Sequence, residues 1–247
     1  MYDGGAVKTR LLRLMITLAV PVTVLGSAST LAAPLEAAHT GAYHPLKSAE
    51  SEAVGEGFDA AWLMALGEQA ALPIMLAEDP KQAGLRFGAI ESGATYYFSE
   101  ISALTPASSG PAQWKELSGQ IFCVAEGSPH AGFVESTYGG VARTYPSAAN
   151  ALIGLKLGEC QAVIADRILL EQIAALPEWR RYNRLLSSVA RQAVSLKVNA
   201  RDPNVQEQIE RAASSKQGKE RLAGITQQWI DEVAFQAYVL ADTLDCH

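Results

Sequence analysis

The stretch IFCVAEGSPHAGFVESTYGGVARTYPSAANALIGLKLGECQAVIAD, from residue 121 to residue 166, decides the fold. Ile121–Ala125 and Ala162–Ala165 are continuously apolar, as strands buried on both faces of a sheet are. Val141–Tyr145 is a short strand that lies between them in the sequence, and helical segments separate the three. This strand–helix–strand–helix–strand order predicts a doubly wound α/β sheet.

Helix signals in this stretch are clear. Ser128 can cap a helix that has Pro129 at its first position and runs through Tyr138, because Ser is a favoured cap and Pro a favoured first residue. Ser147 can cap a second helix, and Gly158 ends it. Each predicted helix therefore connects two strands of the same sheet.

Periodicity and turn residues predict the remaining elements. On the N-terminal side these are a helix over 58–69, a strand over 73–77, a helix over 80–87 and a strand over 96–104. On the C-terminal side they are a half-buried strand over 194–198, a helix starting at 202–203 and an amphipathic stretch over 222–229. A Pro-, Ser- and Gly-rich segment over 105–111 marks a candidate boundary between two lobes.

The N-terminal segment predicts export. Lys8, Arg10 and Arg13 precede an apolar run from Leu14 to Leu25, and small residues follow, which is the pattern of a secretory signal peptide. The alternative is an uncleaved anchor, but the run is shorter than the roughly 20 residues that span a bilayer. We expect residues 1–33 to be the signal peptide, cleavage near residue 32 or 33, and a periplasmic mature protein.

Composition argues against several classes of function. With 26 acidic and 20 basic residues the net charge is −6, whereas nucleic-acid binding needs clustered Lys and Arg. The three cysteines and four histidines show no zinc-type spacing, so neither a metal nor another cofactor is expected. No serine-hydrolase elbow or zinc-protease motif is present, and no enzymatic activity is expected.

Several segments resemble one known family. They are GFDAAWLMALGEQ from residue 57, WKELSGQIFCVAEGSP from residue 114, RTYPSAANALIGLKLGECQAVIADRILL from residue 143, and AVSLKVNARDPNVQEQI from residue 193 with GITQQW downstream. Their order and spacing resemble the type II periplasmic solute-binding proteins, in particular the polar-amino-acid branch of ABC transporters.

The resemblance implies a two-lobed α/β fold in which each lobe is a doubly wound sheet. Residues 34–106 and 198–247 would form lobe one, and residues 107–197 lobe two. The implied function is binding of a small polar solute, such as an amino acid or a related amine or acid. A membrane permease of an ABC transporter would be the partner, and the binding protein itself would be a monomer.

Candidate ligand-binding residues lie at the carboxyl ends of the predicted strands, where such sheets bind ligands. Ser128 and the N–H groups after Gly127 could hold an anion at a helix N-terminus; plain helix capping is the alternative. Asp166 resembles the family aspartate that receives the ligand's ammonium group. Alternatively, Asp166 pairs with Arg167 or Arg143, or caps the helix that follows.

Lobe one supplies weaker candidates. Tyr43, Tyr96 and Tyr97 could form aromatic walls of a cleft, or pack in the core or at its rim. Glu126, in lobe two, could bind a cationic group, or be a solvated strand end.

Lobe one also departs from the family. The Thr-Pro-Glu-Arg segment expected before Phe98 is replaced by ESGATY over residues 91–96. The arginine that would bind a ligand carboxylate with two charge-assisted bonds is therefore absent. We expect a reduced lobe one.

A disulfide between Cys123 and Cys160 is expected. Cys123 lies in the first strand of lobe two and Cys160 directly precedes the third, and neighbouring strands lie about 4.8 Å apart, within reach of a bridge. Some polar-amino-acid binders carry cysteines at both places. Two buried thiols are the alternative, and Cys246 is left without a partner.

Two other functions stay open. The domain could be a degenerate solute-binding protein that acts as a sensor or accessory protein and binds a partner protein. A few dehydratases use the same fold, and then Glu126 or Asp166 would be the acid.

Overall fold

The computed structural model describes residues 33–47 and 57–244, which belong to one compact unit, Ala33–His247. The expected signal peptide lies outside the described residues apart from Ala33, as does Cys246. The strands are β1 (Leu35–Thr40), β2 (Ile74–Leu76), β3 (Leu85–Gly88), β4 (Ala94–Thr105), β5 (Ile121–Ala125), β6 (Val141–Tyr145), β7 (Ala162–Asp166), β8 (Arg184–Leu185) and β9 (Val189–Ala200). The helices are α1 (Phe58–Ala70), α2 (His130–Tyr138), α3 (Ala148–Lys156), α4 (Arg167–Ala175), α5 (Pro203–Ser214) and α6 (Lys216–Leu244), with short 3-10 turns at Trp114–Leu117 and Pro177–Tyr182.

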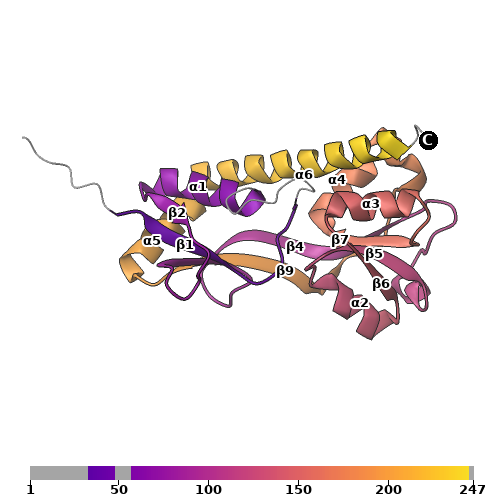
Figure 1. Cartoon of the computed structure of the whole chain (residues 1–247), viewed down its shortest axis with the longest axis horizontal. Helices are drawn as coiled ribbons and strands as arrows, with labels where there is room; N and C mark the ends of the chain where they lie inside the picture. Colours follow the sequence, from indigo (N-terminus) through magenta and orange to yellow (C-terminus); the bar gives the residue numbers. More distant parts are fainter. Residues whose placement is uncertain (1–32, 48–56, 245–247) are drawn as a thin grey trace, which may run out of the picture. The chain divides into compact units, whose positions relative to one another are not determined.

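The described strands form one mixed sheet in the order β2-β1-β3-β9-β4-β7-β5-β6, and β8 pairs with β4 (Figure 1). The long strands β4 and β9 are antiparallel and hydrogen-bonded along most of their length. On one side of this pair, β9 pairs with β3, which leads on to β1 and β2. On the other side, β4 pairs with β7. The two strands therefore connect the two halves of the sheet.

The half containing β5, β6 and β7 has the predicted doubly wound arrangement. All three strands are parallel, with β5 in the middle. Phe122 and Val124 pack with α2 in one core cluster, while Cys123 packs with α3 and α4 in the other. Helices therefore cover both faces, which explains why β5 is apolar throughout.

The other half of the sheet differs from the prediction in two ways: it contains one strand that the sequence pattern did not reveal, and one predicted helix is absent from it. Leu35–Thr40 forms β1, which pairs in parallel with β2 and β3. The helix predicted over 80–87 is wrong: Leu85–Gly88 is β3, and the Asp79 side chain accepts a hydrogen bond from the Lys81 N–H in the turn before it. Residues 77–84 thus cross from β2 to β3 without a helix, so this lobe is reduced as expected.

The C-terminal helices pack across the sheet. Asp202 caps α5 by accepting a hydrogen bond from the Asn204 N–H (2.8 Å), as the Asp-Pro start predicted. The longest helix, α6, packs against both α1 and α3 (Figure 1). Nowhere in the described part of the chain is there a helix with the length and apolar character needed to cross a membrane. Because α6 contacts elements of both halves of the sheet, it does not mark where one lobe ends. The lobe bounds therefore stay a prediction.

A disulfide joins Cys123 to Cys160 with a Cα–Cα distance of 5.7 Å. The predicted pairing is therefore confirmed, and the alternative of two buried thiols is wrong. The bridge ties β5 to the segment that enters β7, and both sulfur-bearing residues are buried. It fixes two of the strands whose carboxyl ends carry the candidate site.

Candidate functional site

A small pocket lies at the carboxyl ends of β5, β6 and β7. Its free volume is about 20 Å³, enough for one water molecule, which needs about 10–15 Å³. The pocket wall combines the turn after each strand with the segment that follows β1: Tyr43, His44, Leu46, Lys47, Ala125, Glu126, Ser128, Pro146, Ala148, Ile164, Ala165, Asp166 and Leu169. Four predicted residues, Tyr43, Glu126, Ser128 and Asp166, are thus brought together.

Asp166 is the buried polar centre of this site, with 2% of its surface exposed. One carboxylate oxygen accepts hydrogen bonds from the hydroxyls of Tyr43 and Tyr97, the latter at 2.5 Å. The other oxygen lies 2.8 Å from His130 Nε2. Because an unpaired buried carboxylate is costly, these three donors explain how the protein tolerates Asp166 at the end of an apolar strand.

The two tyrosines are held in their protonated form. Burial is the main cause that raises the pKa of Tyr43 and of Tyr97, and the charge of Asp166 adds to it. A phenol that keeps its proton can only donate to the carboxylate. Asp166 therefore accepts from groups that a ligand ammonium could replace.

Asp166 neither pairs with Arg167 or Arg143 nor caps the helix that follows, so these alternatives are wrong. Arg167 forms partly exposed ion pairs with Glu171 and Glu100, and Arg143 pairs with Glu159. Asp166 precedes α4 but makes no side-chain capping bond to it. Its carboxylate instead faces the pocket.

The predicted N-cap position of Ser128 is wrong by one residue: α2 begins at His130, and Pro129 is its N-cap. The Ser128 hydroxyl lies just before the cap and accepts a hydrogen bond from the His130 N–H (3.3 Å). The Ser128 N–H donates to Ala125 O (3.2 Å), and Pro129 has no N–H. An anion at this turn would therefore compete with these two hydrogen bonds for the N–H groups of Ser128 and His130.

Gly127 lets the segment after β1 approach the turn closely. Its φ is 74°, and a Cβ at this position would lie 2.5 Å from the carbonyl oxygen of Ala42. A side chain would clash with that backbone as well as strain its own. Gly127 thus shapes the site through its missing side chain.

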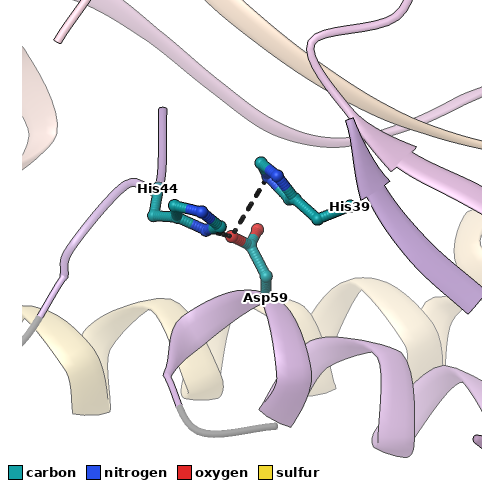
Figure 2. A group of neighbouring side chains, drawn as sticks. All are labelled: His39, His44 and Asp59. Carbon is teal, nitrogen blue, oxygen red and sulfur yellow. Dashed lines mark hydrogen bonds and ion pairs between the residues drawn. The ribbon is translucent and has the colours of Figure 1, made fainter. Parts of the chain in front are cut away.

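Tyr96 lies in a second, neighbouring cluster rather than in the pocket wall. Its hydroxyl donates to buried Asp59 (2.7 Å), and its ring stacks on Trp62 with 4.5 Å between centroids. His44 and His39 approach the other oxygen of the same carboxylate, Oδ2 (Figure 2). Burial is the main cause that raises the pKa of Tyr97, followed by the effects of Asp166 and Tyr43, and the charge of Asp59 adds a smaller effect. Asp59 is therefore close enough to act on the Asp166 cluster.

Sequence reasoning missed four of these residues: His39, His44, Asp59 and His130. Asp59 carried a usable signal, because it lies on the helix face that also carries the buried residues Phe58 and Trp62. A carboxylate on an apolar face needs a partner. The histidines carried no such signal, since the fold alone brings them to the carboxylates.

The described residues offer little for covalent catalysis. Cys123 and Cys160 are both buried and are bonded to each other, so neither offers a thiolate nucleophile. What the site does offer is a buried anion with hydroxyl and imidazole donors, beside Lys47 and Glu126 at the pocket wall. Such an arrangement suits recognition of a small charged molecule.

Solved structures share this fold at low sequence identity. The GluR0 ligand-binding core in complex with L-glutamate has a TM-score of 0.55 and 15% identity, over 81% of this chain and 99% of that one. A variant of ArgBP from T. maritima gives 0.55 and 13%, over 80% and 95%. The amino acid ABC transporter substrate-binding protein AbpA from Streptococcus pneumoniae, bound to L-arginine, gives 0.55 and 14%, over 81% and 96%.

No protein-family model and no curated protein matches the sequence. The structural likeness nevertheless extends over nearly the full length of each of these proteins. The chain therefore has the two-lobed α/β fold of the type II periplasmic solute-binding proteins.

Proposed function

We propose that this protein binds a small polar solute that carries an ammonium group, and delivers it to an ABC transporter. The observation that carries the proposal is the buried Asp166 carboxylate at the carboxyl end of β7, inside a pocket formed by elements from both halves of the sheet. The ligand ammonium would bind Asp166. Ser128 and Lys47 would face the anionic end of an amino acid.

Binding requires the pocket to open. With about 20 Å³ of free volume it cannot admit an amino acid, and the Tyr43 hydroxyl occupies one Asp166 oxygen. Hinge closure around a ligand is a known motion of two-lobed binding proteins. In the bound state, the ligand ammonium would replace the Tyr43 hydroxyl on Asp166.

The proposed location is the periplasm. The basic and apolar N-terminal pattern supports export. Strand β1 begins at Leu35, and the Leu35 N–H donates to Pro73 O (2.7 Å). Removal of the preceding residues leaves this sheet contact intact. Protein recovered from the cell envelope should begin between Ala28 and Leu35 by mass spectrometry; an intact Met1 on a membrane-bound chain would contradict export.

A thermal-shift screen of the mature protein tests solute binding. Amino acids, amines and small acids are added singly, and a ligand at 100 times its Kd should stabilise the protein by about 2.7 kcal/mol. For a domain of this size that raises the Tm by roughly 5–10 °C. Acids without an amine serve as the matched control and should give no shift, because they offer no ammonium group to Asp166. A panel without any response would reject the proposal.

A second candidate function is a sensor or accessory protein that binds a partner protein. The observation that favours it is the filled pocket, in which tyrosine hydroxyls already occupy Asp166. Such a protein would respond to no solute in the screen. Replacing Tyr43 by Phe separates the two candidates, because it should strengthen solute binding only where solute and Tyr43 compete for Asp166.

A further inference from the structure

Three side chains from separate elements meet beside the pocket. His39 lies on β1, His44 on the segment after it, and Asp59 in the first turn of α1 (Figure 2). Asp59 Oδ2 is 3.2 Å from His44 Nδ1 and 3.8 Å from His39 Nε2. All three ligand atoms lie within 4.8 Å of one another.

His39 presents a free nitrogen to this cluster. Its Nδ1 lies 3.0 Å from the carbonyl oxygen of Gly41, which can only accept, so Nδ1 carries the proton. Nε2 is then a lone-pair donor, and it is buried without a hydrogen-bond partner among the described residues. Buried polar atoms without a partner are rare in folded proteins, and this one points toward Asp59.

The ring of His39 is also fixed in place. It stacks on His44 with 3.9 Å between centroids, and it meets Phe87 edge-on at 5.2 Å.

Asp59 is oriented by a second residue. Tyr96 donates to Oδ1 at 2.7 Å, which leaves Oδ2 directed toward both histidines. A hydrogen bond that orients a ligand from outside is typical of metal sites. The Gly41 carbonyl does the same for His39.

We propose that His39, His44 and Asp59 bind a divalent transition-metal ion, with Zn²⁺ as the best fit. Two imidazoles and one carboxylate are zinc ligands, and tetrahedral bonds of about 2.0–2.1 Å place neighbouring ligand atoms roughly 3.3 Å apart. The separations of 3.2 and 3.8 Å need only small shifts to reach that value. Three protein ligands leave the fourth position open for water or an exogenous ligand.

The open side is the side of His44. Its side chain is 45% exposed, whereas that of Asp59 is 9% exposed, and His44 also lines the pocket at Asp166. A metal ion here would thus lie beside the proposed solute site. The metal proposal does not depend on solute binding, because titration of the metal ion is carried out without any solute.

Calorimetric titration of ZnCl₂ into tag-free, metal-free mature protein tests the proposal. We expect one equivalent of Zn²⁺ per chain, and Co²⁺ at the same site should give the strong visible absorption of tetrahedral cobalt. His44→Ala should weaken Zn²⁺ binding at least tenfold, and Tyr96→Phe should weaken it by about 10- to 100-fold, as loss of an orienting hydrogen bond does. The half-exposed His44 can be replaced without emptying the core.

His247→Ala is the matched control, since it removes a histidine that is not one of the three proposed ligands, and it should bind Zn²⁺ as the wild type does. Circular dichroism of each metal-free variant verifies that it is folded. Absence of a one-to-one titration in the wild type would overturn the proposal. So would an unchanged Kd in both His39→Ala and His44→Ala.

Discussion

Breaking the Cys123–Cys160 disulfide is expected to lower the free energy of unfolding by about 4 kcal/mol. The bridge closes a loop of 37 residues, and the chain-entropy model gives roughly this value for such a loop. For a domain of this size that corresponds to a fall in Tm of about 8–16 °C. Thermal unfolding of the Cys123→Ala/Cys160→Ala protein measures it.

Cys246→Ser is the control for this experiment, because it removes a thiol and leaves the bridge. It should unfold at the wild-type temperature. Non-reducing peptide mapping should recover a peptide pair joined through Cys123 and Cys160. A pair that joins Cys246 to either of them, or an unchanged Tm in the double variant, would contradict the assigned role of the bridge.

Replacing Asp166 by asparagine is expected to weaken solute binding roughly ten- to a hundredfold. A hydrogen bond to a charged group contributes about 1.5–3 kcal/mol, and about 1.4 kcal/mol is a factor of ten in Kd. Asparagine keeps the size of the side chain and removes its charge. Calorimetric titration with the strongest ligand from the thermal-shift screen measures the loss.

Ser128→Ala provides the comparison within the same pocket, and it should weaken binding less than Asp166→Asn does. The melting temperature of each variant is measured in parallel, because Asp166 also bonds Tyr43, Tyr97 and His130. An unchanged Kd together with a large fall in Tm would make Asp166 a structural residue. The solute site would then lie elsewhere.

The sequence predicted the half of the fold that has strong local signals. The strand over 121–125 is continuously apolar, and its central residues 122–124 are buried on both faces. Ser147 caps α3 as its position indicates, with its hydroxyl 3.2 Å from the Asn150 N–H. In these segments propensity, capping and burial all favour the same structure, which is the condition under which pattern reading works.

The first half of the chain was harder to predict because its local signals are weak or conflicting. β1 contains two alanines and a glutamate in six residues, which are poor strand formers, and its pairing with β2 and β3 determines its structure. The helix predicted over 80–87 failed for a similar reason. Leu85 and Phe87 pair with β1 and β9 instead, and this tertiary pairing outweighs the helical spacing.

The candidate site was predictable in part. Asp166 and Ser128 follow buried strands, and the rule that ligands bind at carboxyl ends identified them. His130 was not identifiable, because its spacing from Asp166 corresponds to no motif, and the parallel pairing of β5 and β7 brings the two residues together. The cluster of His39, His44 and Asp59 likewise draws on three elements, so no local pattern could contain it.

The crystal structure of the mature protein with its strongest solute tests the central claim most directly. The account predicts an open-to-closed rearrangement in which the solute's ammonium nitrogen lies about 2.7–3.2 Å from an Asp166 oxygen, with the Tyr43 hydroxyl displaced from that carboxylate. A solute bound at any other place, with the bond from Tyr43 to Asp166 still intact, would contradict it.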